Sequence, residues 1–210
     1  MKTKIVITGG NGDIAQAIAA LLKKKYDVYT PDKIELDVTS LYNVKCYMKR
    51  IKPHILINVA GYIYPQAIKE INIEELYKHM NINLIGAIIC SKYAIINGCN
   101  MIINIGSTAG CKGKANWSAY CISKAGLIML SQCLKEEGLF SITLSIGRTN
   151  TKMRKKLFAV EDDSLLMQPK DIAKRIKTWI DSDFDFWNYI NGKNIKMYKK
   201  DGKICIEEVC

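Results

Sequence analysis

Arginine, proline and histidine are scarce in this sequence of 210 residues. The 4 prolines and 14 glycines, together with 49% hydrophobic residues, exclude long disordered, collagenous or coiled-coil structure. A chain of this length accommodates one hydrophobic core and leaves no room for a separate substrate domain of ordinary size. We therefore predict a single globular domain over residues 1–210.

The positive charge is carried mostly by lysine. Basic residues outnumber acidic ones by 31 to 20, and only 4 of the 31 are arginines. Such a surface attracts anions. Proteins that recognise nucleic-acid bases, or that bind phosphate through two hydrogen bonds, favour clustered arginines. Because arginine is scarce here, we expect no nucleic-acid partner. DNA binding stays an alternative that a strongly salt-dependent affinity would reveal.

The eight cysteines are irregularly spaced and form neither a Cys-x-x-Cys pair nor a Cys/His pattern typical of a metal site. Too few apolar residues follow the first lysines for a signal-peptide core. The apolar stretch 82–96 is interrupted by Asn83, Ser91 and Lys92, which favours a buried helix over a membrane span. We expect a reduced, cytoplasmic protein with no metal site and no membrane anchor.

Strand-like and helix-like segments alternate along the chain, which is typical of a parallel sheet covered on both faces. The expected strands are 4–8, 27–30, 55–59, 101–105, 141–145 and 193–198. The expected helices are 13–25, 40–52, 73–97, 118–137 and 169–181. Asp201-Gly202 lies between two alternating stretches and predicts a terminal hairpin within 193–207. The predicted fold class is α/β, a doubly wound Rossmann-type sheet.

One connection is unusually short. Six residues separate Thr30 from Asp37, whereas a crossover between parallel strands needs about a dozen. Residues 34–36 therefore cannot form the next parallel strand. We predict that the sheet lacks one edge strand.

A glycine-rich turn, Thr8-Gly-Gly-Asn-Gly-Asp-Ile-Ala15, follows the first predicted strand and opens a helix. Glycine lets the backbone approach a pyrophosphate, and a helix N-terminus offers free amides. The alternative is a tight corner without a ligand. Asp13 would crowd a phosphate, so its side chain should face away. The candidate binding residues are Gly9, Asn11, Gly12, Asp13 and Ile14.

Asp32 follows the second predicted strand, 24 residues after Thr8. A carboxylate there can accept hydrogen bonds from an adenosine ribose and repel a 2′-phosphate, which favours NAD(H). Lys33 can pair with such a phosphate, so NADP(H) remains possible.

Tyr120 and Lys124 are four residues apart and therefore share one face of a predicted helix. A nearby ammonium favours the phenolate and is expected to lower the tyrosine pKa toward a useful range for proton transfer. Ser107 lies at the carboxyl end of an apolar strand, where sheets of this type bind ligands. The three side chains are expected to converge there.

These motifs resemble the short-chain dehydrogenase/reductase family over essentially the whole chain. The strand 103–107 is similar to the family's catalytic serine strand, and Tyr120-x-x-x-Lys124 matches its Tyr-x-x-x-Lys motif. Further segments resemble family elements that carry Asp37 and Val38 near adenine and Asn58, Ala60 and Gly61 on the adenosine side. Another segment resembles the family element whose asparagine, here Asn83, takes part in a proton relay. A further one resembles the element that carries Thr149 and Thr151 beside the nicotinamide.

The glycine-rich turn departs from the family's usual Thr-Gly-x-x-x-Gly-x-Gly spacing, because Asp13 and Ala15 stand at the later glycine positions. It fits the Thr-Gly-x-x-Gly-x-x-Gly spacing of the family's longer branch, with Ala15 as a substitute. Residues 152–168 are too few for the larger substrate domain of that branch. We predict a short substrate loop there.

The resemblance implies hydride transfer between a nicotinamide cofactor and a carbonyl or alcohol substrate. Tyr120 would exchange the proton, Lys124 would lower the pKa of Tyr120 and hold the ribose, Ser107 would stabilise the oxyanion, and Asn83 would hold a relay water. A catalytically silent dinucleotide-sensing regulator is the alternative, although it would have little reason to retain all four residues.

The family's helices at 81–97 and 118–137 form subunit interfaces, so the resemblance also implies a homodimer or homotetramer. The basic cluster Lys152–Lys156 has two interpretations, a solvated loop or a site that favours an anionic carbonyl substrate.

Overall fold

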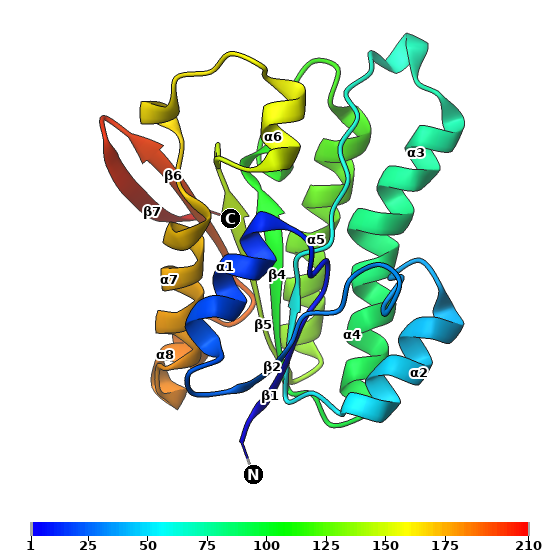
Figure 1. Ribbon diagram of the computed structural model, residues 1–210, viewed down its shortest axis with the longest axis vertical. Helices are drawn as coiled ribbons and strands as arrows, with labels where there is room; N and C mark the ends of the chain where they lie inside the picture. The colour runs from blue at the N-terminus through cyan, green and yellow to red at the C-terminus, as the bar shows by residue number, and fades with distance from the viewer. Residues whose placement is uncertain (1, 210) are drawn as a thin grey trace.

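The computed structural model describes residues 2–209. Seven strands form one sheet in the order β2-β1-β3-β4-β5-β6-β7, parallel except for β7 (Figure 1). The strands are β1 (Lys4–Ile7), β2 (Asp27–Tyr29), β3 (Ile55–Asn58), β4 (Met101–Ser107), β5 (Phe140–Ile146), β6 (Asn194–Lys200) and β7 (Lys203–Val209). The predicted α/β class with a doubly wound sheet is confirmed.

Helices cover both faces of the sheet (Figure 1). The helices are α1 (Asp13–Leu22), α2 (Leu41–Ile51), α3 (Ile73–Met80), α4 (Gly86–Ile96), α5 (Ser118–Glu136), α6 (Lys152–Leu157), α7 (Pro169–Ile180) and α8 (Phe184–Ile190). Helices α1, α7 and α8 pack on one face, and α2, α4 and α5 on the other.

Alternation along β1 explains why the sheet needs both layers. Ile5 and Ile7 are buried in the core under α1 and α7, while Val6 is buried in the core under α2 and α4. A central parallel strand therefore presents apolar side chains to both faces. The carboxyl end of β1 leads directly into the glycine-rich turn.

The sheet ends at β2, a strand of three residues, and residues 31–40 contain no strand. Ile34 in this segment is 90% exposed. The predicted absence of one edge strand is confirmed. A Cβ at Gly10 would lie 2.1 Å from the Thr30 carbonyl oxygen, so the glycine-rich turn passes very close to the end of β2.

The long helix predicted over residues 73–97 is divided. A π-helical turn, η2 (Asn81–Ile85), separates α3 from α4 and carries the buried Asn83. By length and composition alone, the helical stretch Ile73–Ile96 could cross a membrane. In the structure, its α4 part buries Cys90, Ser91 and Ala94 inside the fold. Short π-helical turns inside α-helices frequently mark functional sites.

Two other segments differ from the sequence-based expectation. The segment predicted as a loop at 152–168 contains α6 and a 3₁₀ turn, η4 (Asp163–Leu165), and α8 was not predicted. Both helices are short, with six and seven residues, and span too few turns for a helical repeat of apolar residues to be recognised. At the chain's end, β6 and β7 pair across Asp201 and Gly202, which have φ values of 48° and 74°.

Candidate active site

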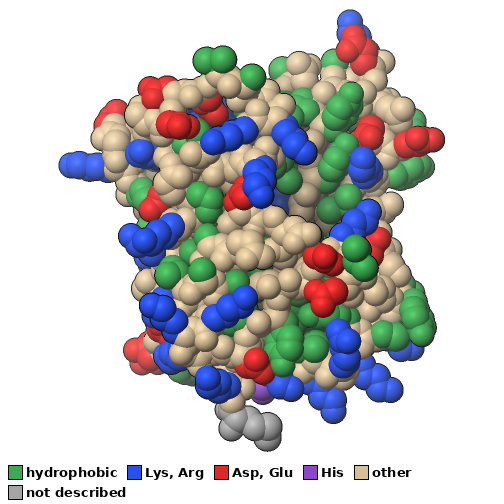
Figure 2. All heavy atoms as spheres, viewed as in Figure 1, with side chains coloured by type: hydrophobic (Ala, Val, Ile, Leu, Met, Phe, Trp, Pro, Cys, Tyr) green, Lys and Arg blue, Asp and Glu red, His purple; other side chains and the backbone are tan. Residues whose placement is uncertain are grey.

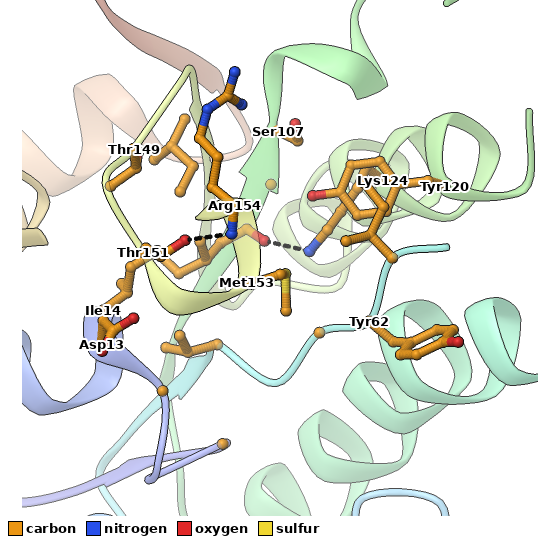
Figure 3. Close-up of a pocket in the computed structure, with 18 of the residues that line it drawn as sticks. Asp13, Ile14, Tyr62, Ser107, Tyr120, Lys124, Thr149, Thr151, Met153 and Arg154 are labelled. Carbon is orange, nitrogen blue, oxygen red and sulfur yellow. Dashed lines mark hydrogen bonds between the residues drawn. The ribbon is translucent and has the colours of Figure 1, made fainter. Parts of the chain in front are cut away.

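A pocket of about 340 Å³ opens at the carboxyl ends of β3, β4 and β5 (Figure 3). Ser107, Tyr120 and Lys124 line it together with the glycine-rich turn and the segment after β5. The predicted residues that line it are Gly9, Asn11, Gly12, Asp13, Ile14, Ala60, Gly61, Ser107, Tyr120, Lys124, Thr149 and Thr151. Residues from five separate parts of the sequence thus meet at one edge of the sheet.

The glycine-rich turn leaves the N-terminus of α1 uncapped. Gly12 is the N-cap residue, and no side chain accepts a hydrogen bond from the first turn of α1. Gly9 has a φ of 71°, and a Cβ there would lie 2.9 Å from the Ala60 Cα atom. The turn can therefore pass close to β3 only with glycine, and free amides face the pocket.

Asp13 does not simply face away from the pocket. Its Oδ2 atom accepts a hydrogen bond from the Lys152 backbone amide at 2.6 Å, and its Oδ1 atom lies 3.9 Å from Lys152 Nζ. The carboxylate also lines the pocket. Because it satisfies the first amide of α6, Asp13 joins the glycine-rich turn to the segment that covers the site.

Tyr120 and Lys124 lie on the same face of α5, and both point into the pocket from one side (Figure 3). Lys124 is buried and its Nζ donates a hydrogen bond to the Ile105 carbonyl at 2.9 Å. The same Nζ lies 5.8 Å from the centre of the Tyr120 ring. The Ser107 hydroxyl accepts a hydrogen bond from the Ala109 amide at 3.2 Å at the end of β4.

The pKa of the phenol differs from the sequence-based expectation. Burial raises the pKa of Tyr120, while a hydrogen bond with Ser107 and the charge of Arg154 act against this rise. Lys124 makes no resolved contribution, and burial lowers its own pKa to about 8. Burial is thus the largest influence on the pKa of the phenol in this structure, and the lowering of that pKa by Lys124 stays a prediction.

Asn83 is buried beside this group. Its amide nitrogen donates to the Tyr62 carbonyl and to Ser123 Oγ, and its Oδ1 accepts from the Tyr62 amide at 2.7 Å. A Cβ at Gly61 would lie 3.6 Å from Asn83 Oδ1 and 3.8 Å from Lys124 Nζ. The π-helical turn thus presents Asn83 across a narrow gap from the ammonium.

A second cavity of about 630 Å³ adjoins the first, and Gly9, Ala60 and Gly61 line both. Asp37, Val38 and Lys33 also line the second cavity. Asp32 does not: its carboxylate accepts hydrogen bonds from the Ile34 and Glu35 amides in a local turn. The Asp32 side chain therefore lines neither cavity. The periodicity and the motif spacing of the sequence did not reveal this.

Asn58 also lies away from both cavities. Its side chain donates to Ser91 Oγ at 3.2 Å and to Asn104 Oδ1 at 2.9 Å inside the fold. Asn104 donates in turn to Ser131 on α5, which bonds Thr143 on β5. Asn58 thus begins a buried polar chain that ties α4, three strands and α5 together.

Sequence reasoning missed two cations at the pocket, Lys114 and Arg148, and named a third, Arg154, only as part of the basic cluster Lys152–Lys156. Lys114, in the loop before α5, Arg148, after β5, and Arg154, on α6, all line it. Arg154 donates to both carboxylate oxygens of Glu161 at 2.5 Å. The positions of Lys114 and Arg148 in the sequence could have indicated them. Both residues come after the ends of strands, as the predicted catalytic residues do.

The two adjoining cavities fit a dinucleotide: free amides lie at their junction, and Lys124 lies buried in one half. Fold and site together define a Rossmann-type oxidoreductase. The short chain dehydrogenase family model matches residues 3–162, and the chain belongs to this family.

Benzil reductase ((S)-benzoin forming) of Bacillus subtilis (strain 168) is 27% identical over 183 residues, covering 71% of this chain and 75% of the reductase. The structure of ElxO with NADP bound has a TM-score of 0.80 at 24% identity, covering 93% of this chain and 97% of that one. The structure of 4-hydroxyisoleucine dehydrogenase complexed with NADH has a TM-score of 0.78 at 22% identity, covering 92% and 96%. At these identities the structural likeness concerns the fold.

The protein is therefore an NAD(P)-dependent oxidoreductase that transfers a hydride between a nicotinamide cofactor and a carbonyl or alcohol substrate. The alternative of a catalytically silent regulator has no support.

Proposed function

We propose that the protein reduces the carbonyl group of a small molecule, with Tyr120 as the proton donor. The observation that carries this proposal is the convergence of Ser107, Tyr120 and Lys124 on one pocket beside an uncapped helix N-terminus. Burial raises the pKa of Tyr120, which keeps the phenol protonated at neutral pH. A protonated phenol is the form that reduction requires.

The bound nicotinamide supplies the hydride in this reaction. Tyr120 donates its proton to the substrate oxygen, and Ser107 donates a hydrogen bond to the same oxygen as negative charge develops on it. Lys124 is held by the Ile105 carbonyl, and its remaining N–H groups face the pocket where a ribose would lie. Asn83, close to Lys124, is suited to hold a relay water.

For cofactor choice, we propose NADP(H) over the NAD(H) preference predicted from Asp32. Lys33 lines the cavity on the adenosine side, whereas the Asp32 carboxylate is already bonded to two backbone amides. A lysine there can pair with a 2′-phosphate.

Calorimetric titration with NAD, NADH, NADP and NADPH tests the cofactor proposal. We expect NADPH to bind at least about tenfold more tightly than NADH, and Lys33→Gln to remove most of that difference. Asp32→Asn is the matched variant, and it should leave the ratio nearly unchanged. Equal affinity for NADH and NADPH in the parent protein contradicts this proposal.

Carbonyl reduction is tested by following NADPH and NADH absorbance with a panel of aromatic and aliphatic aldehydes and ketones. Cofactor binding without turnover of any carbonyl or alcohol would contradict the proposed function. We further propose that the protein is cytoplasmic and that it forms a homodimer or homotetramer. Sedimentation of the purified protein would test the oligomeric state.

A further inference from the structure

The pocket collects cations that are rare elsewhere in the chain. The sequence has four arginines, and two of them, Arg148 and Arg154, line the same pocket as Tyr120. Lys114 lines it from a third segment. Arginine binds carboxylate and phosphate through two parallel hydrogen bonds, which lysine cannot do. The scarcest basic residue is thus concentrated where a substrate would enter.

These cations lie close enough to influence one another. Partial burial lowers the pKa of Lys114, and the charges of Arg154 and Arg148 lower it further. Lys114 Nζ lies 4.7 Å from the centre of the Trp117 ring, which packs edge-on against the Tyr120 ring at 5.7 Å. In Figure 3 the Arg154 side chain extends on the Ser107 side of the pocket, away from Asp13. Lys114 and Arg154 therefore lie on the side of the pocket that carries Ser107 and Tyr120, whereas Lys152, which also lines the pocket, lies beside Asp13 at the glycine-rich turn.

The positive charge here exceeds the negative charge. Glu161 pairs with Arg154 and lies 3.8 Å from Arg148. Among residues 2–209, no other carboxylate lies within 4.0 Å of Lys114, Arg148 or Arg154. Within the described part of the chain, Arg148 and Arg154 share the Glu161 carboxylate and Lys114 has no carboxylate within 4.0 Å, so this side of the pocket carries a surplus of positive charge that attracts an anion.

Two neighbouring lysines are excluded from this role. Lys155 and Lys156, on α6, do not line the catalytic pocket, although the sequence-based hypothesis placed them in the anion-binding cluster. Figure 2 shows basic side chains around α6 as well as elsewhere on this face, so basic charge alone does not identify the site. Position relative to Tyr120 separates the two groups.

We propose that the substrate carries a carboxylate or phosphate group close to its reactive carbonyl, and that Lys114 and Arg148 bind this group while the carbonyl reaches Ser107 and Tyr120. Glu161 orients Arg154 beside them. This inference rests on the proposed carbonyl reduction and adds the charge class of the substrate. Arg148 is 58% exposed in its side chain, so water and salt weaken the attraction without abolishing it.

The test compares anionic probes with neutral counterparts that carry the same reactive carbonyl. One pair is 4-formylbenzoate and its methyl ester, and the other is dihydroxyacetone phosphate and dihydroxyacetone, so that the two pairs distinguish a carboxylate from a phosphate. We expect kcat/KM for at least one anionic member to exceed that of its neutral partner by about tenfold or more. The preference should fall as salt rises from about 20 to 300 mM.

The double variant Lys114→Gln/Arg148→Gln should bring that ratio close to one, mainly through a higher KM for the anion, with the neutral probe little affected. Lys155→Gln/Lys156→Gln removes the same net charge and is the matched control, and it should keep the ratio. Circular dichroism and NADPH affinity report whether each variant is folded.

A second readout is independent of turnover. Calorimetry on the NADPH-saturated protein compares 4-(hydroxymethyl)benzoate with its methyl ester, because an alcohol cannot react with the reduced cofactor, and tighter binding of the carboxylate supports the inference. No preference for the anion in either measurement, or an equal loss in the control double variant, overturns it. Turnover of the neutral probes alone would overturn the inference while leaving the proposed function intact. Absence of all turnover would contradict the function, and the calorimetric comparison would then decide the inference.

Discussion

The reacting side chains and the covering segment, residues 152–168 with α6, are held in different ways. Lys124 is buried and bonded to a main-chain carbonyl, and α5 is further fixed by the Ser131 hydroxyl in the polar chain. The covering segment with α6 is held by charged contacts from Asp13 and from the pair Arg154–Glu161. Charged contacts near the surface weaken with salt, whereas buried neutral bonds do not. Changes of salt should therefore alter substrate affinity before they alter the chemistry.

The largest effect is expected at the phenol. Tyr120→Phe should lower kcat by about 10² to 10⁴ because proton donation in the transition state is lost. Cofactor affinity and melting temperature should change little, since the ring and its contact with Trp117 remain. Stopped-flow and steady-state kinetics measure kcat. A variant that keeps most of its kcat would remove Tyr120 from the mechanism.

The buried support of α5 is tested at Asn104, which is fully buried and joins Asn58 to Ser131. Asn104→Ala should destabilise the fold by about 2 kcal/mol because it leaves buried polar partners unsatisfied. This corresponds to a fall in melting temperature of about 4–8 °C for a chain of this size. Calorimetric unfolding measures it, and an unchanged stability would show that the network contributes nothing.

The hold on the covering segment is tested at Asp13. Asp13→Ala removes the acceptor for the first amide of α6 and should lower kcat/KM by up to about tenfold, mostly through KM. The loss should shrink at high salt, because screening already weakens the contact with the Lys152 ammonium.

Asp162→Ala serves as the control for Asp13, because that carboxylate accepts from the Ser164 amide within the same segment. It should leave KM nearly unchanged. A similar loss in both variants would assign the effect to general loosening of the segment.

The smallest effect concerns a charged contact far from the site. Asp181, at the end of α7, accepts hydrogen bonds from Lys25 at 2.7 Å and Tyr26 at 2.5 Å, and it also pairs with Lys177. These partners hold the pKa of Asp181 well below its usual value of 3.8. Because the carboxylate is partly exposed, screening limits the contribution, and Asp181→Asn should cost about 1 kcal/mol at neutral pH.

The sign of the pH dependence follows from the lowered pKa. The folded state favours ionised Asp181, so its stabilisation is complete above the unfolded pKa near 3.8 and is lost as pH falls below it. Urea unfolding at about pH 7 and pH 3 should show the difference between the parent and Asp181→Asn shrinking at the lower pH. A difference that is constant with pH would contradict the ionic origin.

Periodicity and motif spacing predicted the sheet, its missing edge strand and the shared face of Tyr120 and Lys124. They succeeded because alternation and the helical repeat depend on residues close in sequence. They placed Asp32 at the adenosine ribose, whereas in the structure its Oδ1 atom accepts hydrogen bonds from the Ile34 and Glu35 amides and the residue lines neither cavity, so its contact with a ribose stays a prediction. A short polar side chain has such local alternatives, and sequence does not say which one is taken.

What the sequence determined by itself is the order of elements and which residues reach the carboxyl edge of the sheet, since both follow from local backbone geometry. Tertiary structure decided the link from Asp13 to α6, the internal position of Asn58, and the meeting of Lys114 with Arg148 and Arg154. Those contacts join parts of the chain that are distant in sequence. Their formation depends on how packed helices and loops direct side chains, which no local repeat records.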